Sequence, residues 1–178
     1  MAKRMAKDTT EAEIDAAGTN YARLVPEVPF EHVATHWRIS MIHRLVNAEQ
    51  AAMARRHRLT INDAHLLLLL RLSPPRTYRP SDLSERLFLT NAAITGCTVR
   101  LAERKLILQS CSPSDRRVSF IELTPAGEAL AEEVARENAR DMVATRVIRE
   151  MPADMRAQFD DHLRWLVDRL QAERAVKI

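Results

Sequence analysis

The side chains best suited to do chemistry lie in the middle of the chain, and their chemistry is that of binding a polyanion. Arg116 and Arg117 end a short polar stretch, SPSDRR. Residues 71–117 hold nine Lys or Arg against four Asp or Glu, whereas residues 124–178 hold nine against eleven. Within a net charge of only +3, positive charge is therefore concentrated where a phosphate backbone could lie.

Catalytic and cofactor chemistry find little support in the same sequence. No nucleophile stands beside a base in a known pattern, and three glycines in 178 residues argue against a phosphate-cradling loop. His32 and His36 are four residues apart and raise the question of a metal, but two ligands rarely make a tight site. We therefore predict neither an enzyme nor a bound metal or cofactor.

An apolar pattern that begins near residue 81 supplies the frame for the basic residues. Its spacing fits two short helices that meet across a tight turn and share a small core. The core positions are Leu83, Leu87, Leu89, Ile94 and Cys97. Ser81 and Thr90 are placed to cap the two helices. This pattern is typical of a DNA-binding helix-turn-helix, in which the second helix enters the major groove.

The second of these helices is predicted to present a small, weakly polar face to DNA. The DNA-binding residues predicted on the two helices are Ser81, Asn91, Ala92, Thr95, Gly96 and Arg100. Thr95 can bond a base edge, Ala92 and the neighbouring Val99 can meet a thymine methyl, and Arg100 at the flank suits a phosphate. Because no Arg or Gln lies mid-face, DNA shape and the following hairpin would supply much of the sequence preference.

A basic hairpin follows directly. Residues 107–111 and 118–123 are expected to be strands because they are rich in β-branched and apolar side chains, and the SPSDRR stretch forms the tip between them. Thr124 and Pro125 then have the residue types of a helix N-cap and first helical position. A hairpin in this place is a wing.

At this point the chain resembles the multiple-antibiotic-resistance regulator (MarR) family of winged-helix proteins. The resemblance is carried by residues 106–113, by Asp115-Arg116-Arg117 and by Leu-Thr-Pro-Ala-Gly at 123–127, in the family's order and spacing. The chain departs from the family at Lys105 and Phe88, where glycine is usual, and at Gly96 inside the recognition helix.

The resemblance implies a DNA-binding transcriptional regulator, in particular a repressor released by a small aromatic or phenolic effector. By the same resemblance, Arg117 enters the minor groove and Asp115 orients it. The partners would be a second copy of the chain and double-stranded DNA with a palindromic operator. The alternatives are a redox- or metal-responsive regulator of the same fold and a non-specific architectural DNA-binding protein.

The expected fold is mainly α with a small β wing. Residues 1–29 are polar and are expected to be a flexible tail with at most a short helix over 10–17. Residues 30–178 would form one domain, with a winged helix at about 59–125 and dimerisation helices at about 30–56 and 126–178. One long helix is expected over 125–150, and Pro152 would start the last one.

The last helix carries an apolar stripe, and several other residues suggest a ligand site. The stripe comprises Met155, Phe159, Leu163, Leu166 and Leu170, and it needs a partner surface. The expected effector pocket comprises His36, Trp37, His43 and His65, although a helix-dimer core would also account for Trp37 and His65. Cys97 is expected to be a buried structural thiol and Cys111 to be more exposed. Without an apolar run of about 18 residues or a signal-peptide core, we expect a cytoplasmic protein.

Overall fold

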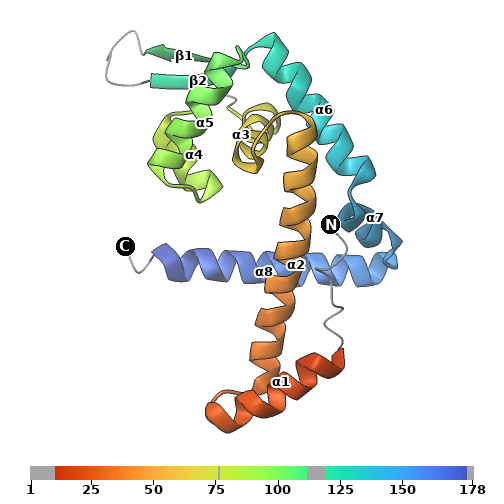
Figure 1. The fold of residues 1–178 in the computed structure, drawn as a ribbon. Coiled ribbons are helices and arrows are strands. Elements are labelled where there is room, and N and C mark those ends of the chain that lie inside the picture. Colours follow the sequence, from red (N-terminus) through yellow and green to blue (C-terminus); the bar gives the residue numbers. More distant parts are fainter. Residues whose placement is uncertain (1–10, 76, 112–118, 176–178) are drawn as a thin grey trace, which may run out of the picture. The chain divides into compact units, whose positions relative to one another are not determined.

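The fold was determined as a computed structural model, which describes residues 11–75, 77–111 and 119–175 (Figure 1). This part of the chain contains eight helices and one two-stranded sheet. Their order is α1 (Glu11–Leu24), α2 (Phe30–Arg56), α3 (Ile61–Leu72), α4 (Pro80–Leu87), α5 (Asn91–Glu103), β1 (Ile107–Cys111), β2 (Ser119–Leu123), α6 (Pro125–Asp141), α7 (Val143–Glu150) and α8 (Ala153–Ala175). The chain divides into two compact units, residues 1–48 and 49–178.

The first unit contains α1 and most of α2. The short helix expected over residues 10–17 is longer than expected, because it spans Glu11–Leu24. Gly18 does not end this helix but lies inside it. A Cβ at Gly18 would lie 2.1 Å from the Phe30 ring, so the missing side chain lets the two helices touch.

The second unit is built around α3, which is surrounded by α4, α5, α6 and β2. Leu66, Leu67 and Leu70 are completely buried, which confirms that this helix lies inside the fold. Thr60 and Asp63 cap its first turn reciprocally, as their spacing in the sequence predicts. α3 is therefore the central helix of this unit, and α4, α5, α6 and β2 pack against it.

The helix-turn-helix is formed by α4 and α5. Leu83, Ile94 and Cys97 are buried as predicted, and Thr90 caps α5 by accepting the Ala93 N–H at 3.2 Å. The prediction that Ser81 caps the first of these helices is wrong, because α4 begins at Pro80 and Ser81 lies in its first turn. The cap is reversed here, because the Asp82 carboxylate accepts the backbone N–H of Arg79 at 3.2 Å.

The hairpin is antiparallel, with Ile107 opposite Leu123 and Cys111 opposite Ser119. Both predicted strands are confirmed within the described residues. On its other edge β2 pairs with Tyr78, which exchanges two backbone hydrogen bonds with Ile121 at 2.9 and 3.1 Å. The base of the hairpin is thus fastened to the segment that leads into α4.

The start of α6 packs against the end of the helix-turn-helix. Thr124 caps α6 by accepting the Gly127 N–H at 3.0 Å, and its hydroxyl donates to the Lys105 carbonyl at 2.8 Å. The Thr124 N–H donates to the Leu106 carbonyl at 3.1 Å. The buried Gly127 lies so close to Leu106 that a Cβ would come within 1.9 Å of the same carbonyl oxygen.

The single helix expected over residues 125–150 is divided in two, and that prediction is wrong. Met142 is extended and buried, and it separates α6 from α7. The Glu49 carboxylate, from α2, accepts the N–H groups of Val143 at 2.6 Å and Ala144 at 3.4 Å. Because those amides start a new helix, a carboxylate there satisfies donors that would otherwise lack partners.

The final helix, α8, is exposed along its described length. Only Leu166 is half-buried, although the helix carries a stripe of large apolar side chains. No helix among the described residues is both long and apolar enough to cross a bilayer.

Candidate DNA interface

The outer face of α5 is available for contacts. Asn91, Ala92 and Thr95 are exposed and Val99 is 50% exposed, as the sequence pattern predicts. The Thr95 hydroxyl donates to the Asn91 carbonyl at 3.0 Å, and its oxygen can still accept a hydrogen bond. Gly96 leaves open space beside it, with only Arg100 Nη1 within reach of a Cβ, at 3.3 Å. This face can therefore approach a groove floor closely.

Arg100 has a partner that the sequence pattern did not suggest. Its Nη2 and Nε donate to the two carboxylate oxygens of Asp63 at 2.7 and 3.2 Å. The Asp63 side chain is only 4% exposed, and its Oδ2 also accepts the Thr60 N–H at 2.9 Å. Burial raises the pKa of Asp63, but hydrogen bonds from Arg100 and Thr60 outweigh it and lower the pKa below its ordinary value. The carboxylate is therefore charged at neutral pH.

A second arginine, Arg104 at the C-cap of α5, is directed at the same region. Arg104 donates from Nη1 to the Arg58 carbonyl at 2.8 Å and from Nη2 to the His57 carbonyl at 3.2 Å. These carbonyls follow the last turn of α2, where acceptors lack helical partners. The two contacts join the recognition helix to the segment between α2 and α3.

The first turn of α4 adds candidate contacts beside α5. Ser81 is exposed and donates to Asp82 Oδ1 at 3.3 Å. Arg79, which the sequence reasoning missed, is exposed, and its guanidinium carbon lies 5.9 Å from the centroid of the Phe120 ring on β2. Its position immediately before Pro80, which starts α4, was the sequence signal that could have placed Arg79 beside the helix-turn-helix. The structure thus brings a cation to the side of β2.

The predicted wing contacts Asp115, Arg116 and Arg117 lie outside the described residues. The described strands end at the paired residues Cys111 and Ser119. The assignment of these three residues to DNA stays a prediction.

Comparison with known proteins identifies the fold. No family model matches the chain, and no curated protein does. Solved structures do match. AbsC, a MarR family transcriptional regulator from Streptomyces coelicolor, aligns with a TM-score of 0.66 and 23% identity over 78% of this chain and 93% of its own. The chain has the MarR fold.

Two further structures of that fold were crystallised with DNA. A point mutant of MarR from E. coli, complexed with operator DNA, aligns with a TM-score of 0.64 and 18% identity over 76% of this chain and 95% of its own. The MepR–DNA complex of S. aureus has a TM-score of 0.64 and 18% identity over 75% and 96%. Two structures of E. coli MarR and one of a MepR mutant align with TM-scores of 0.61, 0.61 and 0.57, each at 18% identity.

The four residues predicted for an effector pocket are divided between the two units of the MarR fold. His36 and His43 are exposed on α2, and Trp37, 36% exposed, meets Phe30 edge to face at 6.5 Å. His65 on α3 is half-buried, and burial lowers its pKa, so its ring is neutral at neutral pH. Among the described residues, no three His, Cys, Asp or Glu side chains gather as a metal site would require.

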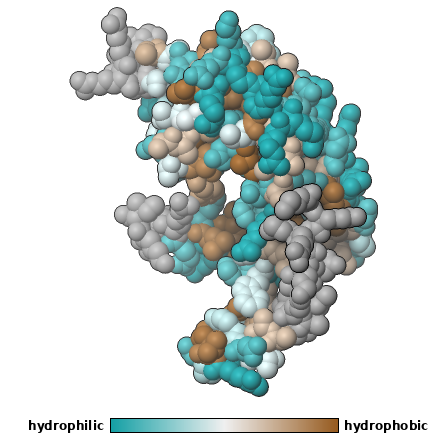
Figure 2. Space-filling model, viewed as in Figure 1, coloured by the Kyte–Doolittle hydropathy of each residue, from teal (hydrophilic) through white to brown (hydrophobic). Residues whose placement is uncertain are grey.

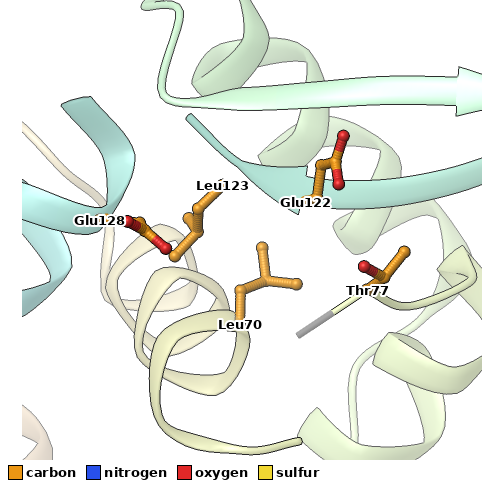
Figure 3. A pocket seen from close by; sticks show the side chains of 5 residues that line it. All are labelled: Leu70, Thr77, Glu122, Leu123 and Glu128. Carbon is orange, nitrogen blue, oxygen red and sulfur yellow. The ribbon is translucent and has the colours of Figure 1, made fainter. Parts of the chain in front are cut away.

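A small pocket elsewhere has different chemistry. It encloses about 110 Å³ and is lined by Leu70, Thr77, Glu122, Leu123 and Glu128 (Figure 3). It contains none of the residues predicted for the effector. With two carboxylates at its rim, it is unsuited to an acidic ligand. The aromatic-acid site therefore stays a prediction based on the sequence.

The two cysteines of this MarR fold should differ sharply in reactivity. Cys97 is buried as predicted; burial raises its pKa to about 11, and nearby Asp63 adds to the rise. Cys111 is exposed, also as predicted. Because the thiolate is the reactive form, a disulfide reagent at pH 8 should titrate one thiol per folded chain and two in denaturant. Fast reaction of both thiols in the folded protein would contradict the buried position of Cys97.

Proposed function

We propose that the chain is a sequence-specific DNA-binding transcription regulator that acts as a homodimer. The observation that carries this proposal is the exposed outer face of α5 on a MarR fold, since proteins of that fold are seen with DNA in two of the aligned structures, one of them with operator DNA. The positive charge of residues 71–117 supports it independently, because phosphate binding needs cations near the recognition helix.

The weakly polar face of α5 determines how we propose that the protein recognises the DNA sequence. Thr95 would contact a base edge, and Val99 and Ala92 would meet thymine methyl groups. Asn91, Ser81 and Arg79 lie at the margin, where phosphates would pass. With no arginine directed outward from mid-helix, the wing and DNA shape would contribute much of the sequence preference.

The dimer is proposed from the surface of α8. Phe159 and Leu163 are 36% and 40% exposed in the single chain, and Leu170 is 61% exposed. Figure 2 shows hydrophobic side chains open at the surface over part of α8. Their spacing of three and four residues makes one stripe, and a second copy would cover it. A two-fold dimer would read two half-sites about 34–36 Å apart, which is why we propose a palindromic operator.

We also propose repression that is relieved by a small aromatic or phenolic acid. The support is the resemblance of the sequence to such regulators and the exposed indole of Trp37. Adding the acid should quench Trp37 fluorescence in a Trp165→Phe background and weaken DNA binding in parallel, because linkage is reciprocal. Quenching without a change in DNA affinity would leave a ligand site with no regulatory part.

The decisive test of DNA binding uses the wing. Arg117→Ala should weaken binding to DNA from upstream of the chain's own gene by about 1–3 kcal/mol, and it should lower the slope of log affinity against log salt by about one phosphate equivalent. Anisotropy titrations at several salt concentrations, on this DNA and on a scrambled duplex, measure both.

Three variants serve as controls for Arg117. Asp115→Ala should cost less and leave the salt slope nearly unchanged, since it removes orientation but no positive charge. Thr95→Ala should change the preference among sites. Arg136→Gln, on the exposed surface of α6, should bind as the parent does. Parental binding by Arg117→Ala would remove the wing from the interface, and equal affinity of the parent for operator and scrambled DNA would favour an architectural protein.

A further inference from the structure

Arg100 and Asp63 join the recognition helix to the core helix through a buried carboxylate. We propose that Arg100 is a positioning residue of the DNA-binding site and not a phosphate ligand: together with Asp63, it fixes the orientation in which α5 presents Thr95 and its neighbours. This inference rests on the proposed function, because it concerns how the same site is held ready for DNA.

The geometry of the pair favours orientation over mere attraction. The planar guanidinium donates from two nitrogens to two oxygens of one carboxylate, which fixes both direction and rotation. Asp63 is itself held, because its Oδ2 accepts the Thr60 N–H and its own N–H donates to Thr60 Oγ1. The capped first turn of α3 therefore serves as a rigid socket for a side chain of α5.

Arg104 provides a second fastening point one turn later. Its two donors reach the carbonyls of His57 and Arg58, directly before the socket in sequence. One contact within α5 and a second at its C-cap restrain the tilt of the helix as well as its rotation. Both arginines therefore direct donors inward, to residues 57–63, while the opposite side of α5 carries the small groups suited to a groove.

Replacing Asp63 separates the two possible roles of Arg100, because the roles predict opposite results. If Arg100 binds a phosphate, Asp63→Asn removes a competing negative charge and should leave operator affinity unchanged or increased. If Arg100 is a positioning residue, the same change releases α5 and should weaken operator binding by about tenfold, without lowering the salt slope. Scrambled DNA should be bound as by the parent.

The experiment pairs the DNA titration with amide hydrogen exchange of the free dimeric protein. In Asp63→Asn, the amides of Ile94 and Leu101 should exchange at least about tenfold faster, while those of Ala131 and Val134 in α6 keep their parental rates. Arg136→Gln is the matched arginine control, since the Arg136 side chain is 59% exposed and pairs with Glu132 on its own helix.

A second variant keeps the test decisive if Asp63→Asn does not fold. Arg100→Lys keeps the charge but loses the planar fork, so a phosphate ligand would survive the change whereas a positioning residue would lose about tenfold in operator affinity at an unchanged slope. Parental affinity in Arg100→Lys, or parental exchange of α5 in Asp63→Asn, would overturn the proposal. If the parent binds no duplex at all, the proposed function fails, and the exchange rates alone decide whether the pair holds α5.

Discussion

Replacing Gly127 by alanine is expected to destabilise the protein by about 3 kcal/mol or more. The new Cβ would lie 1.9 Å from the carbonyl oxygen of Leu106 and 2.9 Å from its carbon. Both atoms are backbone, and the oxygen is already held by the Thr124 N–H, so neither can swing aside as a side chain could. The junction between α5 and α6 would have to open.

Urea unfolding of the variant and its parent measures this effect. Gly96→Ala is the matched control, because its Cβ would meet only the end of the Arg100 side chain, at 3.3 Å. Alanine favours helix over glycine by up to about 1 kcal/mol, so this variant should be as stable as the parent or more so. Equal stability of Gly127→Ala and the parent would contradict the close packing at Leu106.

Leu163→Asp is expected to convert the proposed dimer into monomers. The side chain lies in the middle of the α8 stripe, 40% exposed in the single chain, and a carboxylate there would be buried against a second apolar surface. Losing one half-site should weaken operator binding by more than about a hundredfold, because the two sites no longer bind as one unit. Sedimentation gives the mass, and anisotropy gives the affinity.

Gln171→Asp provides the control for charge on the same helix. Gln171 is exposed and lies about a third of a turn away from the stripe, so this variant should remain dimeric and bind DNA as the parent does. A Leu163→Asp protein that still sediments as a dimer would place the interface elsewhere. A parent that is monomeric at micromolar concentration would reject the proposed assembly outright.

Local signals in the sequence predicted the elements that carry the site. Thr60, Thr90 and Thr124 each cap a helix by accepting an N–H three residues later, so both partners were visible in a short window. The two strands were equally readable from their composition, and the apolar spacing indicated which side of α5 faces the core. For these features, local chemistry and tertiary structure agree.

The failures concern contacts between residues far apart in the chain. Glu49 caps α7 across 94 residues, and nothing near Met142 announces that a helix ends there. Asp63 reaches Arg100 across 37 residues, so the sequence pattern did not reveal the buried carboxylate partner of an arginine that we predicted as a phosphate contact. At Ser81 the error was different. A residue type that favours the N-cap was present, but the carboxylate of Asp82, one position later, accepts the N–H of Arg79 instead.

The three residues with a left-handed backbone in the described chain are not glycines, and the three glycines are not left-handed. This arrangement suggests how the stability of the fold could be increased. Arg58, Phe88 and Lys105 adopt φ between 53° and 57°, while no glycine has a positive φ. Two glycines, Gly18 and Gly127, instead provide room for close contact. Each left-handed residue with a side chain costs about 1–2 kcal/mol. Replacing one of these three residues with glycine could therefore stabilise the protein, and it would leave the DNA-facing side of α5 unchanged.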